Sequence, residues 1–303
     1  MTIFMCTFNG EQFLAQQLDS IANQTFANWS VIVSDDGSTD GTLEILQRYR
    51  DNWGEEKLDV RQGPRRGFAA NFLSVTCSVR NRSHFYAWAD QDDIWRNNKL
   101  EAALSVLQRY PSDTPLLYSA RTELIDGAGS SIGFSPAFKR APSFANALVQ
   151  SIGGGNTMVF NSQAHDLLLH AGPDLDIVAH DWWVYLLVAG VGGEVVHDLT
   201  PTLLYRQHDA NIIGSNTGWG ARVVRLRTMF NGRSQSWNDR NIAALSSVSS
   251  RMSPENGVRF ECFRKARSSK LIRRFLYLKR CGIYRQTVLG NLGLFLAALL
   301  GKL

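Results

Sequence analysis

Over its first 121 residues the sequence alternates two hydrophobic periods, and this alternation constrains the fold more than any other feature. Short apolar runs predict strands, and the segments between them have the period of amphipathic helices. We predict strands at residues 2–8, 29–34, 58–61, 84–89 and 116–119, with helices within 11–24, 41–49, 68–79 and 98–110. Successive strand–helix units build a mainly parallel open sheet, so we predict an α/β fold.

Polar turns follow three of these strands: "TFNG" after the first, "SDDGSTDGT" after the second and "DQDD" after the fourth. In open α/β sheets, ligands bind beyond the carboxyl ends of the strands. We therefore expect the functional site at this edge of the sheet.

The turn after the second strand carries Asp35 and Asp36 where a dinucleotide-binding fold has glycines that cradle a pyrophosphate. An acidic turn does not hold a phosphate, but carboxylates accept hydrogen bonds from ribose hydroxyls and from the imino N–H of a pyrimidine. This predicts a nucleotide held by its base and sugar. The alternative is a purely structural turn in which Asp40 caps the next helix.

The turn after the fourth strand contains an Asp-x-Asp motif, Asp90 and Asp92. Alternate side chains at a strand end point the same way, so the two carboxylates can converge on one divalent cation. Mg²⁺ or Mn²⁺ would relieve their repulsion and neutralise a departing diphosphate. An isolated Asp-x-Asp is a weak motif, and the acidic turn upstream strengthens it.

The remaining chain divides into two parts. Residues 122–216 contain a Gly-rich turn running into a strand at "SIGGGNTMVFN", a helix at "AHDWWVYLLVAG" and a strand at "PTLLYRQHDANIIG". We expect residues 1–216 to form one catalytic domain, with 1–121 binding the nucleotide and 122–216 forming the second wall of the pocket. Residues 217–303 are predicted to be helical, with the clearest break at Pro254 and Gly257.

Positive charge is concentrated near the end of the chain. The net charge is +5, but residues 251–303 contain twelve Lys and Arg against two Glu. Cations interleaved with apolar side chains, followed by an apolar run too short to span a bilayer, predict an interfacial helix on an anionic membrane surface. A helical pair packed on the body with a solvated basic face is the alternative. We expect no nucleic-acid partner.

The cysteines and the N-terminus favour the cytoplasm. The four cysteines are scattered without zinc-site spacing, and the first residues lack the features of a signal peptide. We therefore expect a cytoplasmic protein that is peripheral on the inner face of the cytoplasmic membrane.

Three stretches carry a resemblance to a known family. The segment from "FMCTFNGEQF" to "SDDGSTDGT", then "RRGFAANF" and then "ADQDDIW", resemble the inverting family-2 glycosyltransferases of the GT-A fold. The forms "DQDDIW" and "YRQHDANIIG" are most similar to bacterial rhamnosyltransferases of surface polysaccharide and lipopolysaccharide synthesis. The resemblance implies a Rossmann-like open mixed sheet flanked by helices.

The resemblance also implies roles for individual residues. Asp181 would be the catalytic base, with a simple helix cap as the alternative, and the metal ligands would be Asp92, Asp93 and His208, the last with a structural histidine as the alternative. The implied nucleotide-sugar contacts are Thr7, Asn9, Asp36, Asp90, Asn156, Thr157 and Arg206. We expect Trp182 and Trp183 to stack on an acceptor sugar, with core packing of one of them as the alternative.

The predicted function is metal-dependent, non-processive transfer of L-rhamnose from dTDP-L-rhamnose to a lipid-linked glycan acceptor. A UDP-sugar hexosyl or N-acetylhexosaminyl transferase of the same fold is the alternative, since the acidic turn serves uracil as well as thymine. A nucleotidyltransferase is less favoured because "TFNGEQF" has no phosphate-binding loop, and a non-catalytic glycan-binding subunit is less favoured because Asp36, Asp92 and Asp181 are all present.

Overall fold

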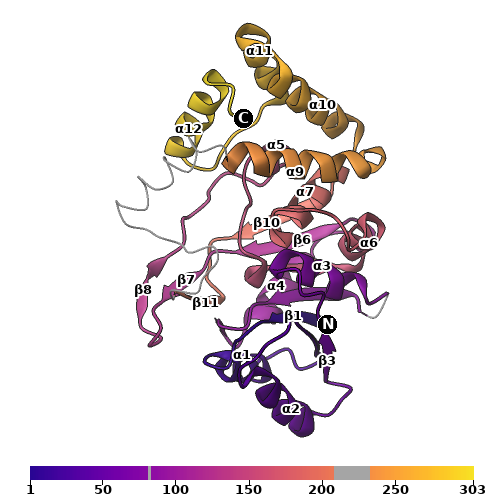
Figure 1. The fold of residues 1–303 in the computed structure, drawn as a ribbon, viewed down its shortest axis with the longest axis vertical. Coiled ribbons are helices and arrows are strands. Elements are labelled where there is room, and N and C mark those ends of the chain that lie inside the picture. The colour runs from indigo at the N-terminus through magenta and orange to yellow at the C-terminus, as the bar shows by residue number, and fades with distance from the viewer. Residues whose placement is uncertain (81–82, 208–232) are drawn as a thin grey trace.

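The computed structural model describes residues 1–80, 83–207 and 233–303. The molecule is elongated, with helix α2 (Thr42–Trp53) at one end of the long axis and helix α11 (Leu271–Cys281) at the other (Figure 1). A central sheet with helices on both faces lies between these ends, which confirms the predicted α/β class.

The central sheet has seven strands in the order β10-β6-β9-β4-β1-β2-β3. Strand β9 is antiparallel to both neighbours, and the other pairs are parallel. The bounds are β1 Thr2–Thr7, β2 Ser30–Asp35, β3 Leu58–Gln62, β4 Phe85–Ala89, β6 Leu116–Ala120, β9 Val159–Asn161 and β10 Glu194–Asp198. All five predicted strands are therefore confirmed within one or two residues.

Burial on both faces explains why the sequence forms these strands. In β1 the consecutive residues Ile3, Phe4 and Met5 are all buried, as expected for a parallel strand covered on both sides. Phe4 packs in the core beneath helices α3, α6 and α7, whereas Ile3 and Met5 pack in the core beneath α1 and α4. The bounds are α1 Leu14–Ala22, α3 Phe68–Cys77, α4 Lys99–Leu107, α6 Ser162–Ala171 and α7 His180–Val191.

A second, four-stranded sheet forms beside the carboxyl ends of the central strands, in the order β5-β11-β7-β8. Its strands are β5 Ile94–Trp95, β11 Leu203–Arg206, β7 Glu123–Ile125 and β8 Ser131–Phe134. Because β11 pairs with both β5 and β7, this sheet brings the end of β11 back to the acidic turn that follows β4.

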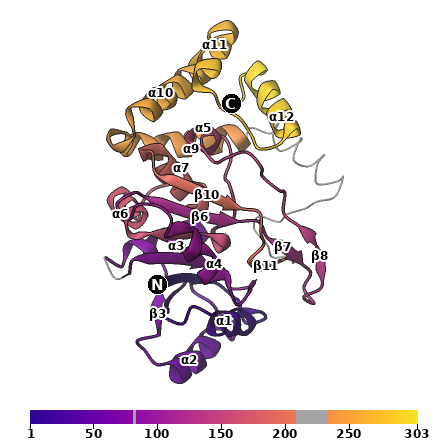
Figure 2. The same ribbon diagram turned by 180° about the vertical axis from the view of Figure 1, so that it is seen from behind.

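The C-terminal helices pack on the body and share its core. Phe260 and Phe263 of helix α10 (Pro254–Ser268) are buried in the same cluster as Trp88 of β4 and Trp183 of α7. The other elements are α5 Phe144–Ala147, η1 Gly155–Thr157, α9 Arg233–Ser247, η2 Ser249–Arg251 and α12 Val288–Leu299. Figure 2 shows α9, α10, α11 and α12 together at one end of the molecule.

The predicted break in the helical region is half correct. Ser253 caps α10 by accepting a hydrogen bond from the Asn256 backbone, and Pro254 is the first helical residue, where its missing N–H costs nothing. Gly257 lies within α10, so its predicted role as a breaker is wrong. In the described part of the chain, no helix combines the length and apolarity needed to cross a bilayer.

Candidate active site

The turn after β2 is built around two carboxylates with different tasks. Asp35 is buried and accepts hydrogen bonds from the Thr7 hydroxyl (2.8 Å) and from the backbone N–H groups of Gly37 (3.0 Å) and Ser38 (2.8 Å). This is the local bonding by which Asp stabilises a tight turn. Asp35 therefore stabilises the turn by internal hydrogen bonds. Thr7, a predicted contact of the nucleotide sugar, is buried against Asp35.

Asp36 points to the other side of the turn. Its two carboxylate oxygens accept hydrogen bonds from the backbone N–H groups of Arg65 (2.6 Å) and Gly67 (2.9 Å), in the loop between β3 and α3. Arg65 adopts a left-handed conformation with φ of 57°, which orients its N–H for this contact. The side chain is half-buried and each oxygen keeps further acceptor capacity, as the predicted contact with a pyrimidine requires.

The turn after β1 is fixed by side chains from both neighbouring turns. Asn9, a second left-handed residue, is exposed and accepts a hydrogen bond from the Thr39 backbone at 2.8 Å. Gln91 pairs with both the N–H and the C=O of Phe8, at 2.8 and 3.0 Å. The three polar turns predicted from the sequence therefore meet at one edge of the sheet.

Asp90, Asp92 and Asp181 lie within electrostatic reach of one another. Burial raises the pKa of Asp90 to about 8, and the charges of Asp92 and Asp181 add to the shift. Asp181 sits in the first turn of α7, where burial raises its pKa to about 6 against the opposing effect of backbone hydrogen bonds from Trp182 and Gly155. Two carboxylates after β4 and one carboxylate from α7 thus share one site.

Asp93 turns away from this group into the protein. It is fully buried, and its carboxylate accepts hydrogen bonds from the Asn156 side chain (2.6 Å) and the Arg206 backbone (3.2 Å). Burial and the charges of Asp92 and Asp90 hold its pKa well above the usual range. Unlike Asp36, Asp93 has no exposed surface through which a ligand could reach it, so we correct its predicted metal role to a structural one.

Arg206 lies behind the acidic turn. Its guanidinium donates to the carbonyl oxygens of Asp92 (3.0 Å) and Gly127 (3.1 Å) and to the Gln16 side chain (2.7 Å), and it lies over the Phe13 ring. The side chain is almost fully buried. Arg206 therefore holds the turn in place, and its predicted contact with the nucleotide sugar stays a prediction.

Lys99 is a buried cation that the sequence analysis did not single out. Its Nζ lies 3.8 Å from the centroid of the Trp95 ring and has no hydrogen-bond partner among the described residues. Burial lowers the pKa of Lys99 to about 7, while the charge of Asp93 acts in the opposite direction. Lys99 is therefore a second buried basic group near the acidic turn, besides Arg206.

The Gly-rich turn supplies the other wall. The first helical turn of η1 contains Asn156 and Thr157, both buried, and Asn156 is committed to Asp93. Gly155 is required here because a Cβ atom would lie 2.2 Å from Nε2 of His180. His180 stacks on Phe72 with ring centroids 3.9 Å apart. This packing holds the start of α7 against η1 and so fixes the position of Asp181.

The predicted acceptor contacts of Trp182 and Trp183 are wrong. Trp183 is fully buried, and Trp182 is 7% exposed with its indole N–H donated to the Ala147 carbonyl at 2.6 Å. Helix α7 is apolar on nearly all sides, which is typical of a buried helix. The predicted metal ligand His208 lies outside the described residues.

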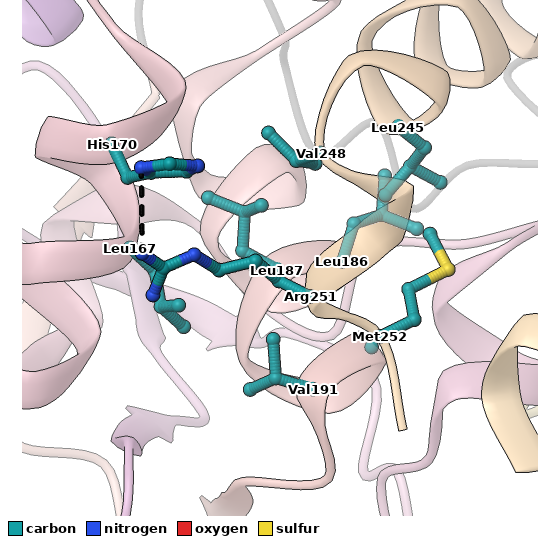
Figure 3. Close-up of a pocket in the computed structure, with 10 residues that line it drawn as sticks. Leu167, His170, Leu186, Leu187, Val191, Leu245, Val248, Arg251 and Met252 are labelled. Atoms are coloured by element: carbon teal, nitrogen blue, oxygen red, sulfur yellow. Dashed lines mark hydrogen bonds between the residues drawn. The ribbon is translucent and has the colours of Figure 1, made fainter. Parts of the chain in front are cut away.

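A small cavity elsewhere in the molecule is not part of this site. It lies where α6 and α7 meet α9 and η2, and Figure 3 shows its lining, including the contact of Arg251 with His170. Its volume is about 10 Å³, roughly the space for one water molecule, so it cannot hold a sugar.

The pair Asp90 and Asp92 fits a divalent cation that is shared with a substrate. No group of three His, Cys, Asp or Glu side chains in the described ranges is arranged to hold a metal ion. Mg²⁺ is commonly bound by one or two carboxylates, with water and substrate phosphate completing its shell. Burial is the main cause of the raised pKa of Asp90, and the repulsion by Asp92 that adds to it is what such a cation would relieve.

Comparison with known proteins identifies the family. The model of the family "Glycosyl transferase family 2" matches residues 2–121. The dTDP-rhamnosyl transferase RfbG of Shigella flexneri is 30% identical over 236 residues, which cover 73% of this chain and 78% of that protein. The chain belongs to glycosyl transferase family 2. It is therefore a glycosyltransferase.

Solved structures confirm the GT-A fold of this family-2 enzyme. TarS of S. aureus, in complex with UDP-GlcNAc, aligns over 92% of this chain and 88% of its own, with a TM-score of 0.54 and 14% identity. The mannosyltransferase PcManGT of Pyrobaculum calidifontis, in complex with GDP-Man and Mn²⁺, aligns over 93% and 85%, with a TM-score of 0.50 and 15% identity.

Proposed function

We propose that this family-2 glycosyltransferase transfers L-rhamnose from dTDP-L-rhamnose to a glycan acceptor, with inversion at the anomeric carbon and without processivity. The convergence of Asp90 and Asp92 with Asp181 at the carboxyl edge of the sheet carries the proposal of a transfer site. The similarity to a dTDP-rhamnosyl transferase supports the choice of donor.

Donor binding is assigned to the two sides of the β2 turn. Asp36, held by the β3–α3 loop, would accept the imino N–H of the base, and Asn9 and the backbone beside Thr7 would border the nucleotide. Asp90 would face the ribose and Thr157 the sugar. Arg206 and Asn156 act indirectly, by fixing the turn that carries Asp92.

Asp92, together with Asp90, would hold Mg²⁺ or Mn²⁺. The bound cation would supply neutralisation of the negative charge that develops on the departing diphosphate. Asp93 is not assigned a metal contact, because hydrogen bonds from Asn156 and the Arg206 backbone hold its carboxylate inside the protein. Its part would be to fix the turn that carries Asp92.

Asp181 is proposed as the general base. Its carboxylate would take the proton of the acceptor hydroxyl while that oxygen attacks the anomeric carbon and the bond from this carbon to the diphosphate oxygen breaks. One displacement inverts the configuration at this carbon. A pKa near 6 leaves Asp181 deprotonated at neutral pH and more basic than an ordinary carboxylate.

The acceptor is proposed to be a lipid-linked glycan of lipopolysaccharide or surface polysaccharide synthesis, met at the inner face of the cytoplasmic membrane. A UDP-sugar donor is the alternative, because a carboxylate such as Asp36 accepts the imino N–H of uracil and thymine alike.

The test measures nucleotide binding before any acceptor is known. Calorimetry of the full chain with dTDP, UDP, GDP and ADP, with and without Mn²⁺, should give the tightest binding for dTDP in the presence of metal. Hydrolysis or transfer is then followed with dTDP-L-rhamnose and UDP-glucose. Preference for UDP would replace the rhamnosyl donor, and metal-independent binding would remove the cation role of Asp92.

A further inference from the structure

Helix α12 presents an apolar face to solvent. Seven side chains on this helix and just beyond it are exposed to between 36 and 87%: Val288, Leu289, Leu292, Phe295, Leu296, Leu299 and Leu300. Their spacing of three, four and one residues places them on one side of the helix. Contiguous exposed apolar patches of this kind mark interaction surfaces in soluble proteins.

Helix α11 packs beside α12 and has exposed apolar and basic side chains of its own. Ile272 and Leu276, one helical turn apart, are 79% and 64% exposed. Exposed cations flank them at Lys270, Arg273, Lys279 and Arg280. From residue 262 to the end of the chain there is no Asp or Glu, so no acidic side chain of this segment offsets these charges.

The two helices pack against each other and, through Leu294 of α12, against the main core of the protein. The rings of Phe275 and Phe295 pack with centroids 5.4 Å apart, and the Arg274 guanidinium donates to the Ala298 carbonyl at 2.8 Å. Ala298 is buried. The exposed apolar face therefore belongs to a packed pair of helices, and Figures 1 and 2 show these two helices at one end of the molecule, beyond the central sheet.

We infer that α11 and α12 form a docking surface for an anionic lipid bilayer, with the α12 face immersed among the acyl chains and the α11 cations on the headgroups. A protein partner could cover an apolar face alone, but exposed cations on the neighbouring helix, in a segment without acidic side chains, match an anionic lipid surface. This inference goes beyond the proposed reaction, because it concerns helices outside the candidate active site.

The test is co-sedimentation of the full chain with phosphatidylcholine vesicles that contain 30% phosphatidylglycerol or none, where 30% is roughly the anionic content of a strongly charged bilayer. The wild type should bind the anionic vesicles, and the double variant Leu289→Glu/Leu292→Glu should lose at least tenfold in binding. Leu43→Glu is the matched control: Leu43 is a 47% exposed leucine on α2, at the other end of the molecule, and its substitution should leave binding unchanged.

The cations are tested separately. Arg273→Gln and Lys279→Gln should each reduce binding to anionic vesicles about fivefold at low salt, because each basic residue near such a surface contributes about this factor. Their binding to neutral vesicles should not change.

A different occupant would give a different pattern. If the wild type does not sediment with anionic vesicles, or if Leu289→Glu/Leu292→Glu sediments like wild type, the inference is overturned. A concentration-dependent dimer in light scattering that this variant abolishes, without vesicle binding, would assign the face to a second copy. dTDP binding of the variants, measured without lipid, reports on the proposed transferase independently of either outcome.

Discussion

Asp181 combines two properties that a general base needs, a position beside Asp90 and Asp92, the carboxylates proposed to bind a metal, and a raised pKa. The same burial that raises this pKa destabilises the ionised form of the folded protein. The structure thus predicts that Asp181 favours activity at the expense of stability.

Asp181→Asn should therefore reduce kcat by about 10²- to 10⁴-fold while leaving dTDP affinity within about twofold. In the wild type, kcat should fall tenfold per pH unit below about pH 6, because only the deprotonated carboxylate accepts a proton. Initial rates between pH 5 and 8, at saturating donor, check this. A variant with wild-type kcat would remove Asp181 from the base role.

The same variant tests the energetic cost of the buried carboxylate. A folded-state pKa above the unfolded value means that the folded protein is favoured by protonation, and this stability is lost as pH rises through about 6. At pH 8, Asp181→Asn should accordingly raise the free energy of unfolding, by at most about 3 kcal/mol. Urea denaturation at pH 5 and pH 8 should show a larger gain at pH 8.

Asp92 and Asp93 are adjacent, but substitution of Asp92 should affect metal-dependent binding and substitution of Asp93 should affect stability. Asp92→Asn should abolish metal-dependent dTDP binding with little change in stability. Asp93→Asn should destabilise the protein by about 1–3 kcal/mol, because its new amide N–H group faces either the Asn156 amide or the Arg206 backbone N–H, and that buried donor loses its acceptor. Calorimetry with Mn²⁺ and urea denaturation separate the two. Equal losses of metal binding at full stability would restore Asp93 as a ligand.

At the scale of elements, the close approach of η1 to α7 depends on Gly155. Gly155→Ala should cost about 1–3 kcal/mol, since the added Cβ would lie 2.2 Å from His180 Nε2 in a filled core. It should also weaken metal-dependent dTDP binding through Asn156 and Asp93. The double variant Gly155→Ala/His180→Ala should recover part of the donor binding, because it removes the clashing ring.

Gly257→Ala is the control for this substitution. Gly257 lies within α10. Apart from its chain neighbours and the backbone of its own helix, no atom lies within 4 Å of a Cβ added at this position. Its replacement should stabilise the protein by about 0.5–1 kcal/mol through helix propensity. Thermal and urea denaturation of Gly155→Ala and Gly257→Ala test both predictions. A destabilised Gly257→Ala would contradict the assignment of Gly257 to a helix interior with space for a Cβ atom.

The elements were predictable where one physical signal dominates. The strands of the central sheet were found because continuous apolar runs such as Ile3–Met5 are buried on both faces. Alternation along a strand end also grouped Asp90 with Asp92, which lie just beyond β4 and interact electrostatically, while their shared cation stays a prediction. The same rule places Asp93 on the opposite side, and the apolar surroundings of Trp182 and Trp183 were already visible as a helix without a polar face.

The supports of the site were not predictable from local patterns. Arg206 meets the acidic turn across 113 and 114 residues of sequence, and Asn156 meets Asp93 across 63. The hydrophobic periodicity of a local segment does not indicate which distant turn a residue will contact. Lys99 was hidden for a related reason, because a lysine in an amphipathic helix ordinarily indicates a solvated face.

At the scale of the whole molecule, the catalytic half and the C-terminal helices share one core. Trp182 of α7 packs edge-on against Trp237 of α9, and Phe260 and Phe263 of α10 lie in the cluster that contains Trp183. The predicted boundary between residues 216 and 217 lies outside the described residues. The shared core nevertheless argues that the two parts stabilise each other.

A chain ending at residue 232 should therefore fail to fold cooperatively, because α7 would lose the helices that cover it. The full chain should show a single calorimetric unfolding transition. A truncated protein that melts cooperatively and still binds dTDP with Mn²⁺ would establish residues 1–232 as an independent domain.

The contact of Arg206 with the acidic turn also has a consequence for how the enzyme matures during translation. The segment that contains β1, β2 and β4 leaves the ribosome long before Arg206 is synthesised, since 113 residues separate Asp93 from it. Until then the turn lacks the guanidinium and the backbone N–H that fix it. A nascent chain can thus assemble the early strands of its sheet, but the acidic turn after β4 becomes ordered only when synthesis has passed β11.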